Sequence, residues 1–158
     1  MQISRKAVQV ASAGDSVAFI GISAKRRRGV AVKTDALRER YARFSAGDLE
    51  RALDLWTDDF VWEGDSTGLP GSGHFEGKQA AIEVLQQTVG AWEKFEMTAE
   101  QFVEQGDTVV VLGYTDAAIG DQSGRVPFAH IWRYRGEQIC GLRGMSDTLT
   151  TAKLLGLA

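Results

Sequence analysis

The stretch VPFAHIWRYRGEQICGLRGMSD, residues 126–147, decides the fold. Ring-bearing side chains recur at every second position of its first half: Phe128, His130, Trp132 and Tyr134. A period of two is typical of a β-strand, and the turn at residues 135–137 leads into a second strand through Ile139, Cys140 and Leu142. We therefore predict a long hairpin that places His130 on one face among aromatic rings.

Length and composition predict a single domain. The chain has 158 residues, of which 44% are hydrophobic, which is enough for one core. Its only cysteine, Cys140, excludes a disulfide framework and favours a reducing compartment, so we expect a cytoplasmic protein. No apolar run approaches the roughly 20 residues of a membrane-spanning helix, so we expect no membrane partner.

Charge is distributed unevenly along the chain. Residues 1–33 contain seven Lys or Arg and one acidic residue, Asp15, although the whole chain has a net charge of −3. We interpret residues 1–33 as a basic N-terminal extension, either flexible or folded into a small hairpin over residues 7–22. The run KRRR at residues 25–28 has no interleaved aromatic residues and matches no binding motif, which argues against a nucleic-acid partner.

Residues 34–158 begin with helices. The spacing of Leu37, Tyr41 and Phe44 predicts a first helix, and residues 49–56 predict a second with Trp56 on its apolar face. The remaining elements that we predict are a strand at 60–63, a glycine-rich loop at 64–77 that can form a lid, a helix at 79–92, strands at 95–104 and 108–118, the hairpin, and a final helix capped by Asp147. This α+β order predicts a curved antiparallel sheet with helices on one face, which together enclose a pocket.

Four segments together resemble one family. They are LRERYARFSAGDLERALDLW at residues 37–56, DDFVWEG at 58–64, GHFEGKQAAIEVL at 73–85 and FAHIWRYRGEQICGLRGMSDT at 128–148. In this order they resemble the SnoaL-like, ketosteroid isomerase-like branch of the nuclear transport factor 2-like superfamily. The resemblance covers residues 34–158 and implies a cone-shaped α+β barrel, usually a homodimer, with a pocket for a small hydrophobic ligand.

The resemblance to ketosteroid isomerases also assigns three roles. These enzymes bind the substrate oxygen through a tyrosine of the first helix and a protonated aspartate of the hairpin, and their base is an aspartate after the first strand. The matching positions are Arg40, His130 and Gly64. Arg40 lacks the hydroxyl and Gly64 lacks the carboxylate, although Glu63 and Asp65 flank it, whereas His130 retains a proton donor.

Two other branches of the superfamily match only in part. Limonene epoxide hydrolases use an Arg-x-Asp pair on the middle strand and an aspartate on the last strand, and SnoaL-type cyclases use that last aspartate. The matching positions are Tyr114, Asp116 and Gly144. Only Asp116 retains a carboxylate, unless Asp147 replaces the missing one, so the resemblance does not transfer the known chemistry.

The residues themselves point to an acid/base site. A period of two places Tyr114 and Asp116 on one strand face, and we predict that this face lines the pocket. Burial raises a carboxyl pKa towards the range that is useful for catalysis at neutral pH, and His130 on the neighbouring strand would either share a proton with Asp116 or hold it ionised. We therefore assign Asp116, His130 and Tyr114 as candidate catalytic residues. The candidate substrate-binding residues are Arg40, Trp56, Trp62, Glu63, Asp65, Trp132 and Gly144.

Each polar candidate also has a purely structural interpretation. His130 is either a pocket residue or a core histidine bonded to a neighbour, and Asp116 is either functional or solvated where its strand leaves the sheet. Glu63 and Asp65 are either pocket carboxylates or surface charges. Asp147 fits a helix cap better than an acid, and His74 is either an exposed loop residue or a cover for the ligand.

Three functional hypotheses remain. Two distant histidines and one cysteine give no metal-ligand spacing, and no nucleotide-binding glycine motif is present, so we expect neither a metal nor a cofactor. The first hypothesis is a cofactor-independent isomerase, polyketide cyclase or epoxide hydrolase acting on a hydrophobic carbonyl or epoxide substrate. The others are a non-catalytic ligand-binding or chaperoning module and an interaction protein that dimerises through its sheet and docks on a partner through the basic extension. We favour the first because of His130 and Asp116.

Overall fold

The computed structural model describes residues 33–158. The predictions for the N-terminal extension, including the small hairpin and the basic run, therefore lie outside the described residues. The described chain forms α1 (Lys33–Ser45), α2 (Leu49–Ala52), β1 (Trp56–Glu63), β2 (His74–Glu76), α3 (Lys78–Gly90), β3 (Lys94–Gln105), β4 (Thr108–Ile119), β5 (Gln122–Arg135), β6 (Gln138–Ser146) and α4 (Thr148–Leu154). The predicted α+β class is confirmed.

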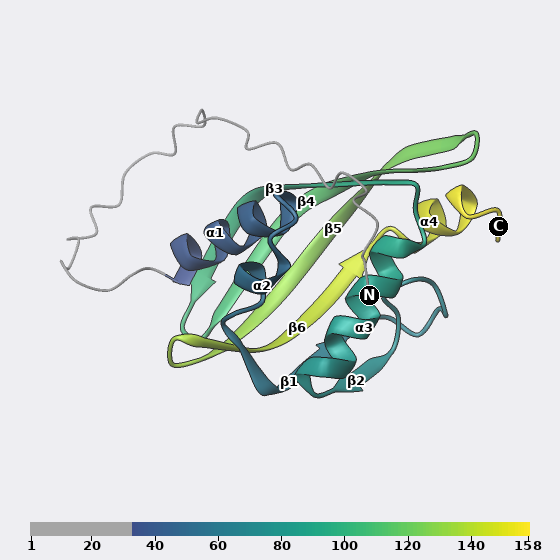
Figure 1. The fold of residues 1–158 in the computed structure, drawn as a ribbon. Helices are drawn as coiled ribbons and strands as arrows, with labels where there is room; N and C mark the ends of the chain where they lie inside the picture. The colour runs from purple at the N-terminus through teal and green to yellow at the C-terminus, as the bar shows by residue number, and fades with distance from the viewer. Residues whose placement is uncertain (1–32) are drawn as a thin grey trace.

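The six strands form one curved sheet in the order β2-β1-β6-β5-β4-β3. Neighbouring strands are antiparallel except β1 and β6, which run parallel. The predicted hairpin is confirmed as β5 and β6, whose register pairs His130 with Gly144. Figure 1 shows α1, α2 and α3 on one side of this sheet. The main core lies between these helices and the sheet.

Capping and helix-breaking residues mark several of the helix ends. Leu37 and Tyr41 are buried one turn apart on α1, which ends before Gly47, whose φ of 75° suits a residue without a Cβ. Asp48 caps α2 by accepting a hydrogen bond from the Arg51 N–H. The predicted cap of the last helix is confirmed, because an Asp147 carboxylate oxygen accepts from the Thr150 N–H at 3.0 Å.

The predicted second helix is too long. α2 ends at Ala52, and Trp56 is the first residue of β1, where it pairs with Ile139 of β6. Trp56 belongs to two apolar periodicities, because it follows Ala52 at helical spacing and precedes the buried Phe60 and Trp62 of a strand. Sheet pairing decides between them. The predicted loop at residues 64–77 likewise contains the short edge strand β2.

The two faces of β4 differ from the prediction. Its buried residues are at odd positions: Val109, Val111, Thr115 and Ala117. On β5 the even residues point inward, and the register pairs Val111 with His130, so these two residues share a face. Tyr114 and Asp116 consequently lie on the opposite, outer face. The run of apolar residues at 109–112 fits either face, so periodicity alone does not decide which one is buried.

Candidate functional site

The inner face of the sheet and the helices above it form a pocket with a volume of about 180 Å³. Most of the lining is apolar and comes from every layer of the fold, including Phe44, Trp62, Trp92, Phe95, Met97 and Phe128. Two of the lining residues at the end of β6, Met145 and Ser146, are exposed to solvent. Such a cavity with few polar groups is typical of a site for a small organic molecule.

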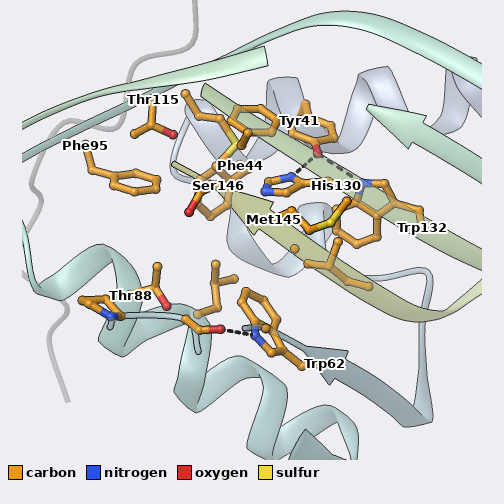
Figure 2. Close-up of a pocket in the computed structure, with 18 of the residues that line it drawn as sticks. Tyr41, Phe44, Trp62, Thr88, Phe95, Thr115, His130, Trp132, Met145 and Ser146 are labelled. Atoms are coloured by element: carbon orange, nitrogen blue, oxygen red, sulfur yellow. Dashed lines mark hydrogen bonds between the residues drawn. The ribbon is translucent and has the colours of Figure 1, made fainter. Parts of the chain in front are cut away.

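A chain of hydrogen bonds crosses one wall of the pocket (Figure 2). Trp132 Nε1–H donates to the Tyr41 hydroxyl oxygen at 3.1 Å, and that oxygen lies 2.6 Å from Nδ1 of His130. The indole can only donate, so the hydroxyl hydrogen of Tyr41 is left to donate to Nδ1. Neutral His130 therefore has its own hydrogen on Nε2.

Burial keeps the His130 imidazole and the Tyr41 phenol uncharged. It lowers the pKa of His130 from 6.5 to about 4, because the apolar surroundings disfavour the imidazolium. It also raises the pKa of the Tyr41 hydroxyl far above its ordinary value, against a smaller opposing effect of the Trp132 hydrogen bond. The Phe128 ring stacks on the imidazole with centroids 4.2 Å apart. At neutral pH His130 thus acts as a hydrogen-bond donor and not as a cation.

The free nitrogen of His130 faces the cavity. Figure 2 shows the imidazole between Tyr41 on one side and the space near Thr115 and Ser146 on the other. Both hydroxyl residues line the pocket, and within residues 33–158 neither side chain makes a hydrogen bond. Three groups on this wall are therefore available to a polar atom of a ligand.

The opposite wall comes from α3 and the loop after β1. Trp62 Nε1–H donates to the Gly71 carbonyl oxygen at 2.9 Å, and the Thr88 hydroxyl donates to the Val84 carbonyl at 2.8 Å. Asp65 is the one carboxylate that lines the pocket in the described part of the chain. It accepts hydrogen bonds from the backbone N–H and the hydroxyl of Thr67, which hold the loop in a turn.

Two predicted catalytic residues lie outside this pocket. Asp116 faces the outer surface, where its carboxylate accepts two hydrogen bonds from the Arg125 guanidinium at 2.8 and 2.9 Å. The hydrogen bond with Arg125 holds the pKa of Asp116 below its ordinary value, opposite in direction to the predicted shift. The same guanidinium lies over the Tyr114 ring, 3.7 Å from its centroid. The prediction that Asp116 and Tyr114 share a cavity with His130 is wrong.

The other predicted residues divide into lining and surface positions. The lining includes Arg40, Trp56, Trp62, Asp65, Trp132 and Gly144. Arg40 makes hydrogen bonds from Nε and Nη2 to the two carboxylate oxygens of Asp54, at 3.0 and 3.1 Å, so its charge is already paired. Glu63 instead lies 3.4 Å from Arg133 in an ion pair. His74 is exposed and bonded to Glu76, and it does not line the pocket.

The sequence comparison missed Tyr41. Spacing from Phe44 places the substrate-binding tyrosine at Arg40, but the next residue supplies a hydroxyl to the pocket wall. The signal was present in the helical spacing, because Leu37 and Tyr41 lie on the buried face of α1. Gly64, the position matched to the base, has no room for a side chain, since an added Cβ would lie 2.0 Å from the Gly71 carbonyl oxygen.

Residues 33–158 contain neither a membrane-spanning helix nor a cluster of metal-ligating side chains. None of the described helices is long and apolar enough to cross a membrane. No group of three or more His, Cys, Asp or Glu side chains in this part of the chain is arranged to hold a metal ion.

The SnoaL-like domain model matches residues 37–142, about two thirds of the chain. The chain belongs to the SnoaL-like domain family. No curated protein matches it. Among solved structures it is similar to a nuclear transport factor 2-like protein of unknown function from Burkholderia pseudomallei, with 23% identity over 78% of this chain and 96% of that chain and a TM-score of 0.70.

Two other solved structures are similar to the same extent of the chain. One is TerC co-crystallised with polyporic acid, with 24% identity over 78% of this chain and 98% of that chain and a TM-score of 0.70. The other is a loop-truncation variant of IdmH, with 22% identity over 78% and 99% of the two chains and a TM-score of 0.64. At these identities the similarity establishes the fold of the SnoaL-like domain.

Proposed function

We propose that this SnoaL-like chain binds a small, mostly apolar molecule that has a carbonyl oxygen, and that His130 polarises that oxygen. The observation that carries this proposal is the hydrogen-bond chain from Trp132 through Tyr41 to His130. It fixes the Nε2–H tautomer, and burial keeps the imidazole neutral. A neutral donor fixed in an apolar cavity is suited to stabilising charge that develops on an oxygen.

The rest of the lining supports a neutral ligand. Aromatic and aliphatic side chains surround most of the cavity, and Arg40, the one cation that lines it within residues 33–158, is paired with Asp54. The Thr115 and Ser146 hydroxyls extend the polar wall beside His130. The similar structure of TerC was co-crystallised with polyporic acid, which supports an organic ligand for this pocket.

A matched pair of ligands tests the proposal. 4-Phenylcyclohexanone and phenylcyclohexane differ in the carbonyl oxygen alone, and both are titrated into wild type and His130→Leu by calorimetry. The ketone should bind His130→Leu about five- to tenfold more weakly, in the range of one net hydrogen bond, whereas binding of the hydrocarbon should hardly change. An equal change for both ligands, or no binding of the ketone to wild type, contradicts the proposal.

Asp65 favours a second candidate function. A cofactor-independent acid/base enzyme, of the isomerase or cyclase type, needs a base near the polarised carbonyl, and Asp65 is the pocket carboxylate of the described chain. Such a base would take a proton from the carbon next to the carbonyl while His130 stabilises the enolate oxygen. The epoxide hydrolase type has less support, because both β4 residues assigned to it, Tyr114 and Asp116, face outward.

Proton exchange distinguishes enzyme from binding module. Wild type should accelerate hydrogen–deuterium exchange next to the carbonyl of 4-phenylcyclohexanone in D₂O, followed by NMR. Asp65→Asn should lower this rate by about 10²-fold or more, the typical contribution of a general base. Asp116→Asn is the control and should exchange like wild type. If the ketone binds but its hydrogens exchange no faster than in buffer, the catalytic function is contradicted and the binding function stands.

A further inference from the structure

Gly144 leaves an open space beside His130. The two residues are direct partners in the β5–β6 register. A Cβ added at Gly144 would meet a single atom within 4 Å, Cδ2 of His130 at 4.0 Å, which is ordinary van der Waals contact. Gly144 is also absent from the glycines with positive φ. Neither the backbone conformation nor close packing therefore requires a glycine at this position.

Other glycines of the central strands differ in this respect. A Cβ at Gly113, beside Phe128 in the register, would lie 2.0 Å from the Thr98 carbonyl oxygen and 2.8 Å from the Phe128 ring. A Cβ at Gly141 would lie 2.9 Å from the Arg133 guanidinium. At those positions neighbouring atoms fill the space of the missing side chain. At Gly144 the space is open, and the residue lines the pocket.

This space adjoins the reactive edge of His130. Cδ2, the atom nearest to the added Cβ, is bonded to Nε2, the nitrogen that has the free hydrogen. When a ligand's carbonyl oxygen accepts a hydrogen bond from Nε2–H, the carbon atom next to the carbonyl group comes close to Gly144. Ser146 lies two residues further along β6 and lines the same pocket. Its hydroxyl makes no hydrogen bond within residues 33–158.

We infer that Gly144, His130 and Ser146 form a branch subsite, which accepts a substituent of about methyl size on the carbon next to the ligand's carbonyl. This inference rests on the proposed carbonyl binding and adds a specificity-determining residue to it. Well-packed cavities discriminate against one added methyl group through overlap, and they gain contacts where a methyl group fills a void. The subsite therefore favours ketones that are branched beside the carbonyl over unbranched ketones.

The test compares 4-phenylcyclohexanone with its cis-2,6-dimethyl derivative. The derivative is methylated on both sides of the carbonyl, so one methyl group faces Gly144 in either orientation. Wild type should bind the dimethyl ketone at least as tightly as the parent. Gly144→Ala should lower the affinity for the dimethyl ketone at least tenfold and should lower the affinity for the parent much less, so that the preference for the branched ketone is lost. Gly90→Ala, an exposed change at the end of α3 with nothing within 4 Å, is the matched control and should leave both affinities unchanged.

The outcomes separate the subsite from the proposed function. If Gly144→Ala binds both ketones like wild type, or weakens both equally, the branch subsite is overturned while carbonyl binding stands. If neither ketone binds wild type, both proposals are overturned. A measurement on the unmodified chain does not depend on how the variant folds: the Gly144 amide NMR signal should shift more with the dimethyl ketone than with the parent. Equal shifts overturn the subsite.

Discussion

The Tyr41 hydroxyl oxygen lies 2.6 Å from Nδ1 of His130, although the two residues are 89 positions apart in the chain. This contact joins α1 to β5, and Trp132 completes it by donating to the same hydroxyl. The three side chains satisfy one another inside an apolar wall, where an unpaired polar group is costly. The same bonds select the tautomer that directs a hydrogen into the pocket.

Removal of the Tyr41 hydroxyl should destabilise the fold. Tyr41→Phe leaves the Trp132 N–H and the His130 Nδ1 without their partner, and an unsatisfied buried group costs about 1–3 kcal/mol. We expect a loss of about 2 kcal/mol in the free energy of unfolding, measured by urea denaturation. The affinity for 4-phenylcyclohexanone should also fall, because the His130 tautomer is no longer fixed.

Tyr114→Phe is the control for this change. Tyr114 lies on the outer face against Arg125, and its hydroxyl makes no hydrogen bond within the described residues. This variant should unfold within about 0.5 kcal/mol of wild type, as ordinary surface substitutions do. If Tyr41→Phe lowers the free energy of unfolding no more than this control does, the buried hydrogen-bond chain adds little to stability.

The sequence predicts His130 well because one strand contains the whole signal. The alternation from Phe128 to Tyr134 places the imidazole among rings, and the structure confirms this placement beside Phe128 and Trp132. The partner that defines its chemistry could not be found in the same way. Tyr41 comes from a distant helix, and the spacing with Leu37 indicates burial without naming what the hydroxyl meets.

The wrong assignment of Asp116 has a similar physical origin. A period of two gives two possible faces, and the apolar residues 109–112 make both faces of β4 look buried. Only the pairing of Val111 with His130 decides between them. The expected homodimer, the cytoplasmic location and the role of residues 1–33 remain predictions.

The protonation of His130 should make stability depend on pH. The unfolded chain binds a proton at His130 below about pH 6.5, whereas the folded chain binds it only near pH 4. The unfolded state therefore binds more protons in this window, and the free energy of unfolding falls as the pH drops from 6.5 to 4. With about 1.4 kcal/mol per pKa unit, the loss approaches roughly 3 kcal/mol.

Two measurements check this pH dependence. Urea denaturation of wild type and His130→Leu between pH 7 and pH 4 isolates the contribution of the imidazole, because the carboxylates are common to both proteins. Wild type should lose stability more steeply than the variant. NMR titration of His74→Gln, which leaves one histidine in the chain, should give an apparent pKa near 4. A pKa near 6.5 would contradict the buried, neutral imidazole.

Asp116→Asn should have little effect on either stability or binding. The carboxylate belongs to an exposed ion pair with Arg125, and such pairs contribute about 0–1 kcal/mol. We expect a change within this range in urea denaturation and an unchanged affinity for 4-phenylcyclohexanone. If the affinity falls tenfold or more, Asp116 takes part in ligand binding, which would contradict its position on the outer face.

The contact between Gly64 and Gly71 should tolerate no side chain. A Cβ at Gly64 would lie 2.0 Å from the Gly71 carbonyl oxygen, which also accepts the Trp62 N–H, so relief of the overlap must move the pocket wall. Gly64→Ala should lose about 2–3 kcal/mol of stability in urea denaturation, in the range for overpacking. It should also weaken the binding of 4-phenylcyclohexanone, because Gly71 and Trp62 line the cavity.

Gly90→Ala is the control for this change. It has open space around its Cβ and should be neutral or slightly stabilising in a helix. If Gly64→Ala is as stable as wild type, the loop after β1 can move away from Trp62 without a loss in the free energy of unfolding.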